Sequence, residues 1–309
     1  MPDKKTATSI GELKVTTFEV PPGDFDPLTA PSAKLAQYGL APKPDQSKEP
    51  ELYKKWQKLY AKKLAYIVPE FRRNEQKYHR PATNRVDIKA GSSTSTNWSG
   101  GIVTAPAGDS FKTVTGNWIV PDPNQPPGQP TGQAYYSAAW IGIDGWGSND
   151  VLQAGTDSDI LVQNGVAHKT VEAWWEWFPE ASVTINNLPV TSGDYMTCLI
   201  TATSATTATV ILANISTNTH ASFKITIPAG ATFKGNCAEW IQEAPTVNNG
   251  QSALCDYGAT FFDEASATTQ KGVVIKGGSG NTINMTNSTG TVISQALIET
   301  PELVKVSFV

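Results

Sequence analysis

The chain has 309 residues, 39% of them apolar, which is enough for one large domain or two with a sizeable core. It has no apolar run of about 18 residues, so no membrane-spanning helix and no membrane partner are predicted. The first residues, MPDKKTATSIGELKV, lack the apolar core of a secretory signal peptide, and no signal peptide is visible in the sequence.

The net charge of −4 is distributed unevenly along the chain. Residues 1–90 hold 17 Lys and Arg against 11 Asp and Glu, whereas the remaining residues hold 7 against 17. A basic segment therefore precedes an acidic body, and we expect the two to attract each other. A solvated basic arm or a nucleic-acid-binding arm would have the same composition, but phosphates would repel the acidic body. No nucleic-acid partner is predicted.

Residues 31–75 are predicted to be largely helical. Apolar side chains recur every four positions at Leu52, Trp56, Tyr60 and Leu64, and lysines occupy the opposite side. Such a helix needs a partner for its apolar stripe, and the acidic body is the expected one. An independent helical hairpin is the alternative, but it would have little core of its own.

Beyond about Asn97 the sequence consists of short alternating segments such as KTVTGNWIV, YMTCLITAT and SFKITIPAG, separated by turns. Many strands without a helix between them predict an all-β fold, an antiparallel β-sandwich. The polar stretch 81–97 before them is predicted to be a flexible linker and a cleavage region. The expected division is a basic, partly helical N-terminal segment with its linker over 1–93 and the sandwich over 94–309.

The three cysteines, Cys198, Cys237 and Cys255, include no CxxC pair and lie far from any histidine cluster, so no zinc site is predicted. Cys237 and Cys255 flank a stretch rich in Pro, Asn and Gly and could close it as a disulfide in an oxidising compartment. Three buried thiols are the alternative.

The motifs of serine, cysteine and zinc hydrolases are missing. The sequence contains no HExxH, no GxSxG, and none of the glycine-rich loops that hold nucleotides. No cofactor is therefore predicted, and carboxylates and amides must carry any chemistry.

Tryptophan is concentrated beside such groups in AAWIGIDGWGSNDVLQAG, VEAWWEWFPE and CAEWIQEAP. Alternation in a strand places Trp174, Glu176 and Phe178 on one face, and Glu239 with Glu243 on one face of another strand. A sandwich face that mixes tryptophan, glutamate and glutamine indicates a ligand cleft. A glycoside hydrolase, with two carboxylates across the cleft, or a lectin-like module would also fit these residues.

The motifs NWSG at 97–100, AWIGIDG at 139–145, LQAG at 152–155, AWWEWFPE at 173–180 and AEWIQE at 238–243 occur in the order typical of glutamic peptidases. The chain resembles this family, the eqolisins, and specifically bacterial-type members with an N-terminal prosegment. The resemblance implies a concanavalin-like sandwich of two bent sheets, with Gln153 and Glu243 as the catalytic residues. It implies substrate-binding roles for Trp98, Trp140, Asp144, Trp174 and Glu176, to which the shared faces add Phe178 and Glu239.

The resemblance also implies a mechanism and a setting. Glu243 would activate water as general base and then act as general acid, while the Gln153 amide would stabilise the oxyanion. We expect an acid-acting endopeptidase of polypeptides, monomeric, secreted or extracytoplasmic, with the basic N-terminal segment covering the acidic groove as an intramolecular inhibitor.

Overall fold

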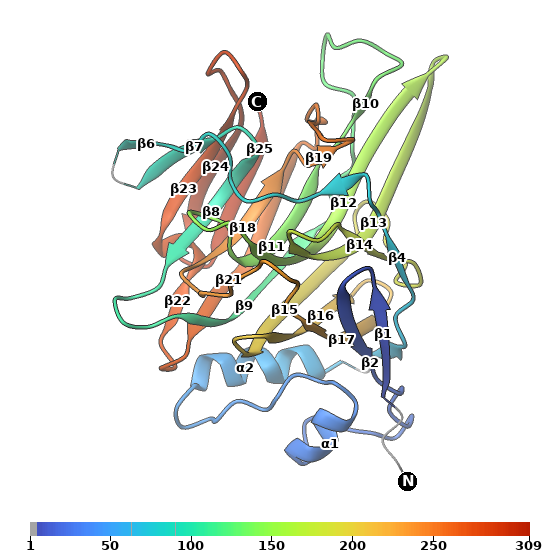
Figure 1. The fold of residues 1–309 in the computed structure, drawn as a ribbon, viewed down its shortest axis with the longest axis vertical. Coiled ribbons are helices and arrows are strands. Elements are labelled where there is room, and N and C mark those ends of the chain that lie inside the picture. Colours follow the sequence, from blue (N-terminus) through green and yellow to red (C-terminus); the bar gives the residue numbers. More distant parts are fainter. Residues whose placement is uncertain (1–4, 63, 90) are drawn as a thin grey trace.

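A computed structural model of the chain describes residues 5–62, 64–89 and 91–309. Within this part, about half of the residues lie in two large, mainly antiparallel sheets that pack face to face (Figure 1). This confirms the predicted all-β sandwich. No helix in the described residues is long and apolar enough to cross a membrane.

Sheet A consists of β22–β21–β9–β15–β16–β17, and at its β17 edge it is extended by the hairpin β2–β1 and by the parallel strand β3. Its strands are β1 (Thr6–Ile10), β2 (Leu13–Thr17), β3 (Ala65–Ile67), β9 (Phe111–Ile119), β15 (Tyr195–Ser204), β16 (Thr207–Asn214), β17 (Thr219–Thr226) and β22 (Val274–Lys276). The long strand β21 (Ala259–Thr269) pairs with β9 in sheet A and with β25 in sheet B, and so joins the two sheets.

Sheet B has the central order β4–β14–β13–β12–β11–β18–β8–β23–β24–β25. Its strands are β4 (Phe71–Arg73), β6 (Val86–Lys89), β7 (Ser92–Ser95), β8 (Trp98–Thr104), β10 (Ala134–Tyr135), β11 (Ala138–Asp144), β12 (Val151–Gln163), β13 (Val166–Phe178), β14 (Val183–Ile185), β18 (Cys237–Glu243), β23 (Asn281–Thr286), β24 (Val292–Thr300) and β25 (Leu303–Phe308). A small third sheet joins β5 (Lys77–Tyr78), β19 (Thr246–Val247) and β20 (Gly250–Gln251), and one 3₁₀ turn, η1, spans Gly277–Ser279.

Strand alternation divides the side chains of sheet B between two faces. Trp175 and Trp177 of β13 belong to the core between the sheets, together with Trp118 of β9 and Trp240 of β18. Trp174 belongs to a separate cluster on the outer face, with Trp98 and Trp140. The sandwich core therefore leaves a second aromatic surface on the side of sheet B that faces away from sheet A.

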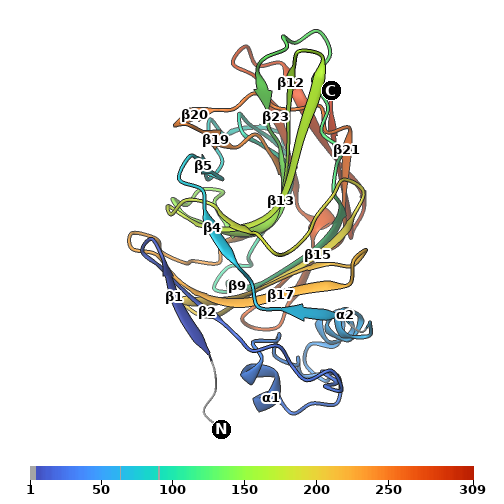
Figure 2. The same ribbon diagram turned by 90° about the vertical axis from the view of Figure 1, so that its right-hand side faces the viewer.

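The N-terminal segment wraps around the sandwich (Figure 2). Its helices α1 (Ser32–Gln37) and α2 (Pro50–Tyr60) cover the outer face of sheet A, where Trp56 and Tyr60 pack against Leu199 and Ile211. The chain then passes the edge of the sandwich through β3 and β4 and reaches the outer face of sheet B. The apolar stripe of α2 thus has the partner expected for it.

Three local expectations need correction or completion. The helical prediction for residues 31–75 is confirmed only over 32–37 and 50–60. It was wrong for residues 38–49, which form turns and irregular structure, and after Tyr60, because residues 65–67 and 71–73 are strands that pair with β17 and β14. The stretch predicted to be a flexible linker contains β6 and β7, and β7 pairs with β23. All three cysteines are buried free thiols, so the disulfide alternative was wrong.

His220 on β17 is fully buried where the N-terminal segment covers sheet A, and neither ring nitrogen has a hydrogen-bond partner in the described part of the chain. Its ring contacts Tyr60 and Tyr66, at centroid distances of 6.1 and 4.9 Å. Burial lowers the pKa of His220 from 6.5 to about 3. The neutral ring is therefore favoured in the folded protein, and the stability present above pH 6.5 is lost as the pH falls from 6.5 towards 3.

We predict that His220→Leu flattens this pH dependence. The pKa difference corresponds to roughly 5 kcal/mol of lost stability at the acid end. Denaturant unfolding of both proteins between neutral and acidic pH measures the effect, with His168→Leu at an exposed position of β13 as the matched control. Parallel stability curves for His220→Leu and the unsubstituted protein would contradict the assignment.

Candidate active site

The outer face of sheet B carries the residues that the sequence analysis singled out on β8, β11, β12, β13 and β18. Cross-strand neighbours place Gln153 opposite Glu176 and Glu243 opposite Trp98. These four side chains and those of Trp140 and Trp174 are all fully buried. The alternation of strands brings them to one face, and the N-terminal segment covers them.

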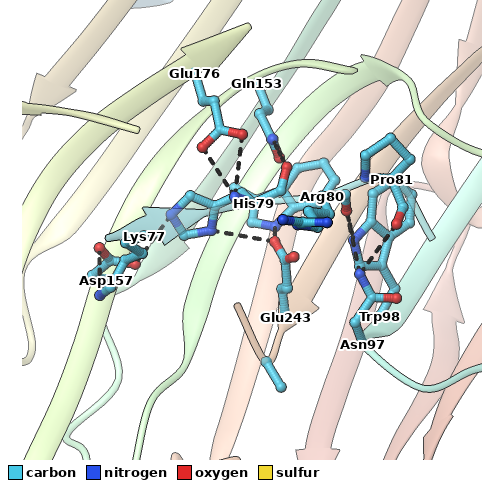
Figure 3. Close-up of polar contacts among 12 residues, drawn as sticks. Lys77, His79, Arg80, Pro81, Asn97, Trp98, Gln153, Asp157, Glu176 and Glu243 are labelled. Atoms are coloured by element: carbon cyan, nitrogen blue, oxygen red, sulfur yellow. Dashed lines mark hydrogen bonds and ion pairs between the residues drawn. The ribbon is translucent and has the colours of Figure 1, made fainter. Parts of the chain in front are cut away.

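The covering segment is the stretch 77–83, which runs across this face in extended form. The stretch includes His79, whose main chain lies between the side chains of Gln153 and Glu243 (Figure 3). The β5 pairing with β19 and a hydrogen bond from the Ser182 amide to the Lys77 carbonyl hold the stretch before His79. Sequence reasoning missed His79, because no local pattern links a lone histidine to a face 70 residues further along the chain.

Gln153 and Glu176 bind the backbone of His79. The Gln153 Nε2 donates to the His79 carbonyl oxygen at 2.5 Å. The His79 amide donates to both oxygens of Glu176, at 3.2 and 3.0 Å. Burial raises the pKa of Glu176 well above its usual range, although the bond from the His79 amide opposes this shift. The two side chains therefore recognise a peptide backbone, independently of the side chain it carries.

Glu243 lies on the other side of the segment. Its Oε2 accepts a 2.9 Å hydrogen bond from Trp140 Nε1 and lies 3.3 Å from His79 Nδ1, while its Oε1 has no partner among the described residues. Burial raises the pKa of Glu243 well above its usual range. Gly142 gives Trp140 its position, because a Cβ there would lie 2.9 Å from the indole ring.

The imidazole of His79 fills the space beside Glu243. It stacks on Trp174 with ring centroids 3.5 Å apart and planes 6° from parallel. Burial, and then the charge of Lys77, lowers the pKa of His79 well below 6.5. The neutral form of the buried ring is therefore favoured, and the ring occupies the space next to the Glu243 carboxyl.

An acidic pair on β12 binds the lysine two residues before His79. Lys77 Nζ lies 2.9 Å from Asp157 Oδ2 and 2.6 Å from Asp159 Oδ2, and the lysine is almost fully buried. Burial alone would lower the pKa of Lys77, but the two carboxylates raise it above its usual range. Sequence reasoning missed both aspartates, although their spacing from Gln153 in one strand puts all three on the same face.

Residues after His79 are held by the start of β8. Trp98 Nε1 donates to the Arg80 carbonyl at 3.0 Å, and Asn97 Nδ2 donates to the carbonyls of Arg80 and Pro81 at 3.2 and 3.3 Å. The guanidinium of Arg80 lies 6.0 Å from the ring of Phe178. Trp98 and Phe178 are thus both close to the segment.

Asp144 and Glu239 lie apart from His79. Asp144 accepts hydrogen bonds from the amides of Lys234, Gly235 and Asn236, at 2.9, 2.9 and 2.8 Å, and so fixes the loop before β18. Burial, and then the charge of Asp144, raises the pKa of Glu239, whose carboxyl adjoins Cys237. Geometry thus distinguishes Glu243 from Glu239, which the sequence alone could not do.

No group of three or more His, Cys, Asp or Glu side chains among the described residues could hold a metal ion. The chemistry of the site as built is that of a carboxyl group and a carboxamide on opposite sides of an extended peptide. Such a pair can move a proton and stabilise a developing negative charge on a carbonyl oxygen.

The buried ion pairs of Lys77 generate a prediction for stability. Lys77→Met leaves the buried Asp157 and the partly buried Asp159 without a cation, and we expect a loss of about 3–5 kcal/mol in the free energy of unfolding. Lys14→Met, at an exposed position of β2, is the matched control and should stay within about 0.5 kcal/mol. Denaturant unfolding measures both, and equal stability of the two variants would contradict the buried ion pairs.

Comparison with known proteins shows which family the chain resembles. Residues 96–308 match the model of the Peptidase A4 family. Aspergillopepsin-2 of Aspergillus niger is 25% identical over 245 residues, which cover 71% of this chain and 81% of that protein. Scytalidopepsin B of Scytalidium lignicola is 28% identical over 162 residues, which cover 52% of this chain and 56% of that protein.

The fold agrees as well. A crystal structure of scytalido-glutamic peptidase with a transition state analog inhibitor superposes with a TM-score of 0.58 at 25% identity, covering 69% of this chain and 98% of that chain. A second, with a peptide-based transition state analog, has a TM-score of 0.57 at 24% identity and the same coverage. The resemblance found in the sequence is confirmed: the chain belongs to the Peptidase A4 family, the glutamic peptidases or eqolisins, and is a hydrolase of peptide bonds.

Proposed function

We propose that Glu243 and Gln153 are the catalytic residues of an endopeptidase that acts on polypeptides at acidic pH. One observation carries the assignment. The Gln153 amide and the Glu243 carboxyl both contact the same residue of an extended peptide, His79, and they do so from opposite sides (Figure 3). A substrate in the place of this segment would present its carbonyl to Gln153 and receive water from the side of Glu243.

In this mechanism Glu243, ionised in the open groove, takes a proton from a water molecule, and the water oxygen adds to the substrate carbonyl carbon. The Gln153 amide donates to the oxygen as it becomes negative, a contribution of roughly 3 kcal/mol to the barrier. Glu243 then returns the proton to the departing nitrogen. Glutamate suits acidic conditions because an exposed carboxyl titrates near pH 4.3 and changes protonation state readily there.

The aromatic and acidic neighbours would bind the substrate. Trp140 orients Glu243 through its indole nitrogen, and Glu176 binds the backbone amide of the residue whose carbonyl meets Gln153. Trp98, Trp174 and Phe178 would bind substrate groups on either side of that residue. Asp144 shapes the loop 234–236 instead of contacting the substrate, and Glu239 is not part of this mechanism.

Three substitutions test the catalytic pair. Glu243→Gln should lower kcat/KM on a denatured protein at acidic pH by about 10²–10⁴-fold, because it removes the acid–base group. Gln153→Ala should lower kcat by about 10²–10³-fold through the lost oxyanion donor. Glu239→Gln is the matched control on the same strand. Since burial favours the neutral form of Glu239, a neutral amide there should leave kcat/KM within about threefold. A loss with Glu239→Gln comparable to that with Glu243→Gln would contradict the assignment of catalysis to Glu243 alone of the two.

We further propose that the N-terminal segment is an intramolecular inhibitor. Ion pairs support its attraction to the acidic body: Arg72 to Glu172 at 2.7 Å, Arg73 to Glu180 at 2.8 Å, and the contacts of Lys77. The segment covers Glu243 and keeps it in the neutral form, which cannot accept a proton from water. Burial raises the pKa of Asp157 and Asp159, so acid protonates these partners of Lys77 and weakens the attraction.

A synthetic peptide covering residues 70–85 tests the inhibition directly. It should inhibit chain from which the N-terminal segment has been removed, in competition with substrate. The same peptide with His79→Ala should bind about tenfold more weakly, because stacking on Trp174 is worth about 1 kcal/mol and the contact with Glu243 adds to it. Equal inhibition by both peptides would contradict a specific role of His79.

The proposal has three further points: the chain divides between residues 93 and 94, it is monomeric, and it acts outside the cytoplasm. The family match, which starts at residue 96, supports the boundary. Acid-dependent activity fits a compartment more acidic than the cytoplasm.

A further inference from the structure

We propose that the peptide bond between His79 and Arg80 is the bond that this chain hydrolyses in itself, which separates residues 1–79 from residues 80–309. The proposal rests on the proposed function of Gln153 and Glu243 and applies it to the segment that covers them.

The first argument is the partner of each carbonyl in the segment. Lys77 presents its carbonyl to the Ser182 amide, and those of Arg80 and Pro81 accept from Asn97. Of these four carbonyls, only that of His79 accepts a hydrogen bond from Gln153, at 2.5 Å. If Gln153 stabilises the oxyanion, the carbonyl carbon poised for attack is that of His79.

The second argument is the position of Glu243. Figure 3 shows it on the side of the His79 main chain opposite Gln153. One of its oxygens is held by Trp140, and the other, Oε1, has no partner among the described residues although it is buried. That oxygen is available to orient a water molecule towards the same carbonyl carbon.

The third argument is the register. Lys77 is fixed by Asp157 and Asp159 two residues before His79, and Trp98 with Asn97 fixes the carbonyls that follow. The backbone is thus held on both sides of the bond between His79 and Arg80. A shift by one residue would break all of these contacts together, so the geometry selects this bond over its neighbours.

The side chain of His79 keeps the bond intact in the closed state. The ring stacks on Trp174 and lies 3.3 Å from Glu243, where the water must enter. Besides Glu243, the charged or titratable groups that face it are Glu176, Asp157 at 3.6 Å from Nε2, and Lys77. Burial lowers the pKa of the ring. A pH below 6.5, the ordinary pKa of histidine, therefore favours the state in which the ring has left the site and is protonated. Water can then reach the bond and Glu243, which is no longer fully buried and can ionise.

The step balances without any other reagent. A water oxygen adds to the His79 carbonyl carbon while Glu243 takes one proton, and the bond to the Arg80 nitrogen then breaks as Glu243 delivers the proton to it. The products are a carboxyl group on His79 and a free amino group on Arg80. Cleavage here cuts the N-terminal segment at the point where it covers the dyad.

The test uses the full chain, purified at neutral pH and shifted to about pH 4. Intact mass and N-terminal sequencing follow the products, and cleavage of a denatured protein is measured in parallel. We expect fragments 1–79 and 80–309, formed at a rate independent of protein concentration. Arg80→Pro should slow this cleavage by at least about 100-fold, because the proline ring distorts the bond, whereas Arg80→Ala should stay within about tenfold. Unfolding curves at neutral pH verify that both variants are folded.

A peptide assay removes the dependence on the folding of the variants. Processed enzyme should cut a synthetic peptide of residues 72–86 after His79. A first cut elsewhere, or self-cleavage unaffected by Arg80→Pro, would overturn the proposal while leaving the peptidase function intact. Cleavage of added protein by a chain that itself stays uncut would also overturn the proposal. Failure to cleave either itself or added protein would overturn both proposals.

Discussion

The hydrogen bond from the Gln153 amide to the His79 carbonyl connects the two halves of this molecule. It joins the acidic sandwich to the basic segment that precedes it, and it puts a peptide carbonyl within reach of a buried carboxyl. The bonds from His79 to Glu176, from Lys77 to two aspartates, and from Trp98 to Arg80 all maintain the position of that one residue. The wrapping of residues 5–75 around sheet A brings the segment to this face.

Burial has opposite effects on the two titratable groups that meet at the site. It raises the pKa of Glu243 and lowers that of His79, so both groups favour their neutral forms while the segment is in place. A neutral glutamic acid cannot activate water, and a neutral ring stacked on Trp174 occupies the space that water needs. In the proposed mechanism, covering the site therefore removes both the base and the water.

Many residues of the candidate site could be predicted from the sequence, because the patterns that indicate them lie within single strands and short motifs. Alternation in VEAWWEWFPE assigned Trp174 and Glu176 to one face and Trp175 to the other, as the structure has them. The family motifs predicted the sandwich and the peptide-bond hydrolase. Glu243 and Glu239 share a face and a strand, and only the three-dimensional arrangement of Trp140, Cys237 and Asp144 separates their surroundings.

The part that could not be predicted depends on contacts between residues far apart in the chain. Pro69 disfavours a helix through residues 65–73. The strands that form there instead depend on the edges of β17 and β14, which offer unpaired backbone groups. The roles of His79 and Lys77 follow only from contacts with residues that lie 74 to 164 positions later in the chain. No periodic pattern within a short stretch of the sequence predicts these long-range contacts.

The most direct test of this account is the binding of a peptide-based transition-state analogue, measured by calorimetry at neutral pH with two forms of the protein. The account predicts no measurable binding to the intact chain, since residues 77–83 fill the site, and one-to-one binding once the N-terminal segment has been removed. Equal binding by the intact chain would contradict it, because the Gln153–Glu243 face would then be open to substrate.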